Sequence, residues 1–142
     1  MAKFVLYKNE GKIYRLEAEL PPSDAYIVFD FDAENPEDLI YDGSQVRLKT
    51  QDEKLQELKS QKLSELETYV ESILAPTDYI VIEIAEAQIQ NNTAEVEALK
   101  QKYATQLQQR KAIRQWNEQT KQAIKNAQSL DALNSIVIQF SG

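Results

Sequence analysis

The chain has 142 residues, a formal net charge of −7 and a hydrophobic content of 42%. This length fits one domain, or a small domain with a helical extension. The hydrophobic content excludes wholesale disorder, and the acidic balance argues against generic binding to nucleic acid or to anionic membranes.

Histidine and cysteine are both missing from the sequence. The chain therefore lacks the usual general base, the commonest metal ligand, thiolate metal sites and disulfides. It has no glycine-rich phosphate loop and no apolar run of the roughly 20 residues that span a bilayer. We expect a protein that is not an enzyme, uses no cofactor, enters no membrane and stays in the cytoplasm where it is made.

The first 50 residues predict a small antiparallel β-sheet. Strand-like segments lie at 4–7, 13–20, 26–31, 39–41 and 46–48. A turn ending at Gly11 joins the first two segments, and Asp42-Gly43 is a hairpin signal between the last two. The second segment alternates partly between apolar and charged residues, which places one face against a core.

Acidic residues gather between positions 30 and 42, which superficially suggests a calcium site. An EF-hand loop would need Gly and Glu at the places where this chain has Asn35 and Tyr41. We therefore interpret the segment as a solvated acidic loop and predict no metal site.

From residue 51 the hydrophobic period becomes that of a helix. No glycine lies between Ser44 and Ser141, and Pro76 is the only proline there. Both residues disfavour helix interiors, so the stretch predicts long helices broken near Pro76. Apolar residues from Leu55 to Leu74 share one broad face, whereas Lys and Glu fill the other.

After Pro76, Thr77 or Asp78 can cap a second helix. The β-branched run 79–84 would suit a strand, but the capping signal and the Ala and Glu residues that follow favour a short helix, which we predict. Asn92 and Glu95 resemble a capping box that opens a helix continuing to about residue 127.

The apolar stripe of this last long helix shifts phase around Arg110. It begins as Val96, Leu99, Tyr103 and Leu107 and continues as Ile113, Trp116, Thr120, Ala123, Ile124 and Ala127. Without Gly or Pro, such a shift suggests a bend, a coiled-coil discontinuity or a change of packing partner. Ser129 can cap a final short helix that carries Leu130, Leu133, Ile136 and Val137.

The helical part divides into an acidic and a basic block. Eight acidic and no basic residues lie between Glu65 and Glu97. The stretch from Lys100 to Lys125 contains seven basic residues and a single acidic one, Glu118. If the helices fold back antiparallel, the blocks lie opposite each other and pair within the chain. The basic block with Trp116 could instead contact phosphates and stack on bases. We favour a packed helix and predict no nucleic-acid partner.

Short motifs in residues 54–138 resemble the C-terminal region of caudoviral tail proteins. The segment Ala75-Pro-Thr-Asp-Tyr-Ile80 resembles their Thr-Asp-Trp/Tyr step, with Tyr79 where Trp is frequent. The segment Arg110-Lys-Ala-Ile-Arg-Gln-Trp116 resembles their Arg-x-x-Ile/Leu-Arg helix, and residues 121–133 resemble their ending. These proteins are commonly encoded beside tail-fibre genes and are called tail-fibre assembly proteins or chaperones.

The resemblance implies a phage tail-fibre assembly chaperone or fibre-associated protein that binds the fibre and assists its folding and trimerisation. The alternative is a structural tail or baseplate subunit that attaches fibres in the virion; a helical nucleic-acid-binding protein is the third reading. The protein would lie in the host cytoplasm during assembly and, if it stays attached, in the virion tail. Because fibres are typically trimeric, a trimer is the homo-oligomer expected by analogy.

The sequence therefore predicts an α+β fold. A small antiparallel β domain would occupy residues 1–50, and a helical hairpin or coiled-coil-like region for oligomerisation and partner binding would occupy 51–142. The apolar stripes look wider than one intrachain partner can cover, so we expect them to contact another chain. The predicted partner-binding residues are Leu55, Leu58, Leu66, Ile73, Ile113, Trp116 and Ile124.

Overall fold

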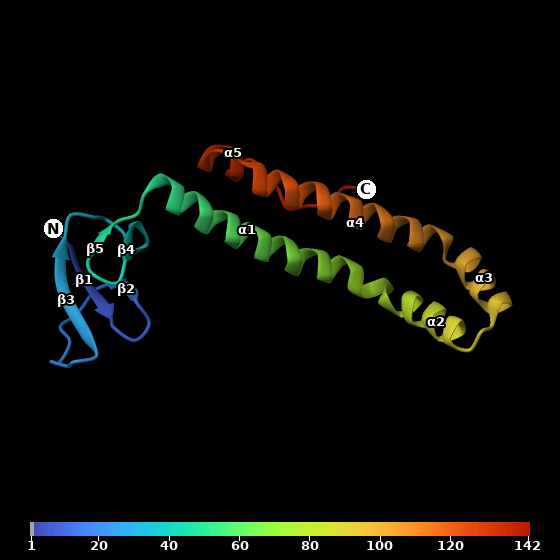
Figure 1. Ribbon diagram of the computed structural model, residues 1–142, viewed down its shortest axis with the longest axis horizontal. Helices are drawn as coiled ribbons and strands as arrows, with labels where there is room; N and C mark the ends of the chain where they lie inside the picture. The colour runs from blue at the N-terminus through green and yellow to red at the C-terminus, as the bar shows by residue number, and fades with distance from the viewer. Residues whose placement is uncertain (1) are drawn as a thin grey trace. The chain divides into compact units, whose positions relative to one another are not determined.

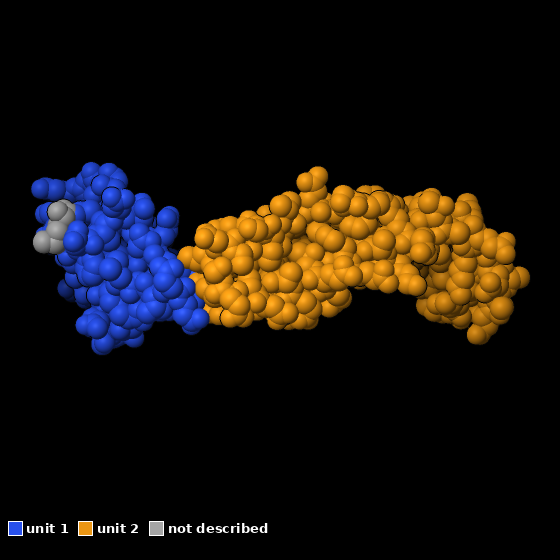
Figure 2. All heavy atoms as spheres, turned by 90° about the horizontal axis from the view of Figure 1, so that it is seen from above, with its two compact units in different colours: residues 1–54 blue, residues 55–142 orange. Residues whose placement is uncertain are grey.

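The computed structural model describes residues 2–142, which divide into two compact units, 1–54 and 55–142 (Figure 2). The predicted α+β class is confirmed, because a small antiparallel sheet precedes the helices. The observed division falls after residue 54 rather than after residue 50. The first turn of α1 (Gln51–Leu74) is tied to the N-terminal unit through Glu53, which pairs with Arg47 at 2.6 Å, and through Lys54, which pairs with Asp38 at 3.2 Å.

The N-terminal unit contains a three-stranded sheet and a separate hairpin. Strands β1 (Ala2–Tyr7), β2 (Lys12–Arg15) and β3 (Tyr26–Phe31) pair antiparallel in the order β2-β1-β3. The hairpin consists of β4 (Leu39–Tyr41) and β5 (Val46–Leu48), preceded by the short helix η1 (Pro36–Asp38). The core of this unit is made of Phe4, Val5, Leu6 and Leu39.

The predicted second strand, 13–20, is too long at its C-terminal end. The register pairs Arg15 with Phe4, so β1 offers no strand residue opposite positions beyond Glu17. Both predicted turns are confirmed. Gly11 adopts a φ of 65° and its amide donates to the Tyr7 carbonyl, and the Asp42 carboxylate accepts the two amides that follow Gly43.

The C-terminal unit is a helical hairpin (Figure 1). Its outgoing arm is α1, the short helix η2 (Ala75–Thr77) and α2 (Asp78–Ile89), and its return arm is α3 (Thr93–Lys102) and α4 (Ala104–Asn126). Helix α5 (Leu130–Asn134) follows. The helical interpretation of residues 79–84 is confirmed. The predicted caps at Asn92 and Ser129 are also confirmed, because the Asn92 side chain accepts the Glu95 amide and the Ser129 side chain accepts the Ala132 amide.

Three details of the helices differ from the prediction. The Thr77 hydroxyl caps no helix, because it donates backwards to the Leu74 carbonyl at 3.1 Å. The single helix expected to reach residue 127 is two helices that meet at Tyr103. The last helix ends at Asn134, so Ile136 and Val137 lie in the segment 135–142, which has no regular secondary structure.

Of the three readings of the phase shift at Arg110, the change of packing partner is confirmed, because Leu107 packs with residues of α2 and α3 whereas Ile113 and Trp116 pack with residues of α1. The buried residues of the return arm follow one another at spacings of three, four or seven, which is the heptad pattern of a continuous seam. They are Val96, Leu99, Tyr103, Arg110, Ile113, Thr120, Ile124 and Ala127. The seam continues through Arg110, whose side chain is itself buried. A charged residue on an otherwise apolar seam therefore looks like an interruption when the sequence is read by hydrophobicity alone.

The core of the hairpin consists of two clusters. One joins α1, α4, α5 and the C-terminal segment 135–142, with Leu66, Ile113, Ile124 and Leu133 buried to 4% exposure or less. The other joins α2 to α3 around Ile80 and Leu99. The outgoing arm passes from one cluster to the other at Pro76, where proline removes a backbone donor.

Candidate functional site

The seven predicted partner-binding residues all belong to the first core cluster. Leu66, Ile113 and Ile124 are buried, with exposed fractions of 1%, 4% and 0%. The other four, Leu55, Leu58, Ile73 and Trp116, are partly buried against them. The chain itself covers much of this surface, which the width of the stripe did not predict. Contact of the seven residues with a partner stays a prediction.

The C-terminal segment 135–142 supplies that cover, and the sequence reasoning missed it. Ile136, Ile138 and Phe140 pack against the cluster, while Val137 is 70% exposed. Lys62 donates to the Ile136 carbonyl at 2.9 Å, and the Phe140 amide donates to the Tyr69 hydroxyl at 3.0 Å. The cluster of apolar residues Ile136, Val137, Ile138 and Phe140 so close to the end of the sequence is the signal that could have revealed it.

Trp116 lies between the rings of two other residues. Its ring centroid is 5.7 Å from that of Tyr69 on α1 and 5.7 Å from that of Phe140 in the C-terminal segment. Such edge-on and tilted pairs stabilise a core. The ring therefore packs within the chain rather than standing free for stacking on a base.

Arg110 connects the two arms of the hairpin. Its Nη1 donates to the Leu74 carbonyl and to the Thr77 hydroxyl, both at 2.8 Å, and lies 3.0 Å from an Asp78 carboxylate oxygen. Within residues 2–142, this is the one ion pair that joins the acidic block of the outgoing arm to a basic residue of the return arm. The expected pairing of the two blocks is therefore seen at two places, at this pair and between Glu97 and Lys100 on α3.

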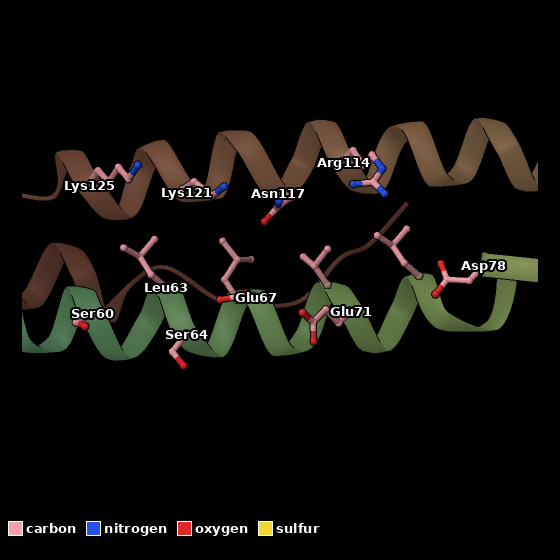
Figure 3. A pocket seen from close by; sticks show the side chains of 13 residues that line it. Ser60, Leu63, Ser64, Glu67, Glu71, Asp78, Arg114, Asn117, Lys121 and Lys125 are labelled. Carbon is pink, nitrogen blue, oxygen red and sulfur yellow. The ribbon is translucent and has the colours of Figure 1, made fainter. Parts of the chain in front are cut away.

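A groove of about 810 Å³ lies between α1 and α4, and we call it the central groove (Figure 3). Its apolar lining is Leu63, Leu66, Val70 and Leu74, and Figure 3 shows Leu63 pointing from α1 towards α4. The two helices also line it with charges of opposite sign. Helix α1 contributes Glu67 and Glu71, and α4 contributes Arg114, Lys121 and Lys125. A groove with an apolar floor and charged sides suits another amphipathic helix.

Helix α2 carries apolar residues on its outer side as well as in the core. Val81, Ile82 and Ile89 are 45%, 58% and 80% exposed. Together with Ala85 they form the α2 stripe, since spacings of three, four and seven place residues on one helix face. Beside the stripe runs a groove of about 560 Å³, which Lys100 and Lys111 line from the return arm. An exposed apolar stripe of this kind marks an interaction surface.

The described residues, 2–142, hold no group of three acidic side chains close enough together to bind a metal ion. No helix within that range is long and apolar enough to cross a bilayer. The arrangement offers apolar docking surfaces with charged borders.

Comparisons of the chain with protein-family models, with curated proteins and with solved structures found no match.

Proposed function

We propose that this chain is a non-catalytic accessory protein of a phage tail fibre, which binds the fibre and assists its folding and trimerisation. The resemblance that suggests this function is carried by two short motifs, residues 75–80 and 110–116. Each motif is short and carries little information, so the resemblance is better supported if the two motifs contact each other in the folded chain. They do so here, because Arg110 of the second motif donates a hydrogen bond to Thr77 and pairs with Asp78, which both belong to the first.

The α2 stripe is the surface that we assign to the fibre. Its side chains are exposed at the end of the hairpin where α2 turns into α3. An unfinished fibre chain exposes apolar surface before it trimerises, and such surface binds a complementary apolar stripe. The lysines beside the stripe, Lys100 and Lys111, would favour acidic residues next to the apolar patch of the fibre.

The proposal predicts that a tail-fibre gene lies beside this one, and the decisive experiment is coexpression of the chain with that fibre. The chain should raise the yield of soluble, trimeric fibre and should co-purify with it. A variant with Ile82→Glu and Ile89→Glu should lose both effects, because it places carboxylates on the stripe. A control with Gln90→Glu and Gln101→Glu adds the same charge at exposed positions outside the stripe and should act like the wild type.

Unchanged fibre yield together with no co-purification would sink the chaperone function. The alternative, a structural tail or baseplate subunit, predicts stoichiometric presence in purified particles with no effect on fibre folding. The trimer was expected only by analogy with fibres, and the mass of the purified protein decides between three chains and two.

A further inference from the structure

The central groove holds charges that the chain itself leaves without an opposite partner. Glu67 and Glu71 on one side and Arg114 on the other are exposed and line the groove. In the part of the chain that the structure describes, none of these three side chains forms an ion pair. The lining between them contains Leu63, which is only partly buried, and the polar Asn117 of α4. This combination is typical of an interface core with a polar rim.

We propose that the central groove is the contact face of a homodimer, in which each hairpin lays its α1 over the α4 of a second copy. The inference goes beyond the proposed function and uses a different surface. A two-fold interface needs a patch that is complementary to itself, and the groove meets this condition because it carries an acidic and a basic side. The product is a four-helix arrangement that covers the apolar lining of both copies.

The contacts within one chain determine which charges would meet. Arg110 lies level with Leu74, and the rings of Tyr69 and Trp116 touch, so Glu71 and Arg114 stand at the same level. A two-fold axis parallel to the helices leaves the position of every residue along the helix direction unchanged. It therefore brings Glu71 opposite the partner's Arg114 on both sides of the dimer.

Another two-fold axis, in the contact plane but perpendicular to the helices, would place α1 on α1. The acidic sides of the two grooves would then meet, and like charges at an interface oppose association. An unrelated amphipathic helix would need an acidic and a basic flank of its own to match the groove. A second copy already carries both flanks, and for this reason we assign the groove to it.

The first test is the mass of the purified full-length chain by light scattering over a range of protein concentrations. We expect twice the 16.3 kDa of one chain. We also expect association to weaken as salt is added, since screening acts on the exposed charges. The mass of a single chain at the highest concentration, or the mass of three chains, would overturn the proposal.

The second test exchanges the charges of the groove. A variant with Glu67→Lys and Glu71→Lys has two basic sides, and one with Arg114→Glu and Lys121→Glu has two acidic sides. Each alone should dimerise about tenfold more weakly or worse, whereas their mixture should associate as the wild type does. Circular dichroism verifies that both variants keep their helix content. Either variant alone dimerising as strongly as the wild type, or a mixture of the two that does not associate, would contradict the proposed arrangement.

Glu65→Lys is the matched control for this series, because Glu65 is an exposed residue of α1 outside the groove. It should leave the dimer unchanged, as should Ile82→Glu with Ile89→Glu in the α2 stripe. The two proposals therefore fail separately. If the protein is a dimer but has no effect on the fibre, only the proposed function is contradicted. If it is a monomer that raises fibre yield, only the proposed dimer is contradicted.

Discussion

The guanidinium Nη1 of Arg110 lies 2.8 Å from the backbone carbonyl oxygen of Leu74, 36 positions earlier in the chain. This carbonyl belongs to the last residue of α1, where helix carbonyls lack intrahelical donors and carry partial negative charge. Pro76, just beyond, contributes no N–H. A buried cation thus satisfies a helix end at the place where the outgoing arm passes from one core cluster to the other.

Replacing this cation should destabilise the hairpin. Arg110→Met keeps much of the volume but removes the hydrogen bonds, and we expect a loss of about 1.5–3 kcal/mol in the free energy of unfolding. Urea unfolding followed by the fluorescence of Trp116, the single tryptophan, measures it. Lys111→Met, at the neighbouring exposed position outside the central groove, is the control and should change stability by about 0.5 kcal/mol or less. Equal effects of the two variants would contradict the role given to Arg110.

The C-terminal segment should contribute measurably to the stability of the hairpin. Phe140→Ala removes a ring that packs on Trp116, and we expect a loss of up to about 3 kcal/mol together with a red shift of tryptophan emission. Val137→Ala changes a residue of the same segment that is 70% exposed, so the stability and the emission should stay close to wild type. A Phe140→Ala protein that behaves like Val137→Ala would indicate that the segment does not pack as described.

Acid should loosen the junction between β5 and α1. Hydrogen bonding to Arg47, and then to the Thr50 amide, lowers the pKa of Glu53 from 4.5 to about 2. Because this pKa is lower in the folded state, the stabilisation is present above about pH 4.5 and is lost as the pH falls towards 2. In an NMR titration, the Thr50 amide should report a midpoint near 2. Glu53→Gln should reduce the loss of stability across this window without abolishing it, because hydrogen bonds from the Gln45 and Ser44 amides also lower the pKa of Asp42 to about 2. Asp52→Asn, at the neighbouring exposed carboxylate, removes one negative charge outside the pair with Arg47 and is the matched control.

Removing either of two tyrosine hydroxyls in the N-terminal unit should change its stability, in opposite directions. Within residues 2–142, the Tyr26 hydroxyl oxygen is the one buried side-chain polar atom without a hydrogen-bond partner. Tyr26→Phe should therefore stabilise the sheet, by about 1 kcal/mol. Tyr41→Phe loses a 3.0 Å bond to the Gly43 carbonyl and should cost up to about 1 kcal/mol. Amide hydrogen exchange in β1 and in β4 measures the two effects, and a destabilised Tyr26→Phe protein would refute the first.

Local signals were sufficient for most element boundaries. The Asp42-Gly43 turn, the caps at Asn92 and Ser129 and the end of α1 before Pro76 all depend on residues within a few positions of one another. The break at Tyr103 has no Gly, Pro or capping residue to mark it in the sequence, and it was missed.

By itself the sequence determined the α+β class, the two hairpin turns and the alternation of apolar and charged helix faces, because backbone preferences and hydrophobic period act over a few residues. Only the tertiary structure decided which apolar residues remain available. The segment 135–142 returns to cover Trp116 and Tyr69, and this depends on contacts between residues far apart in the chain. The same holds for Arg110, whose charge suggests an exposed position until the carbonyl of Leu74 is brought beside it.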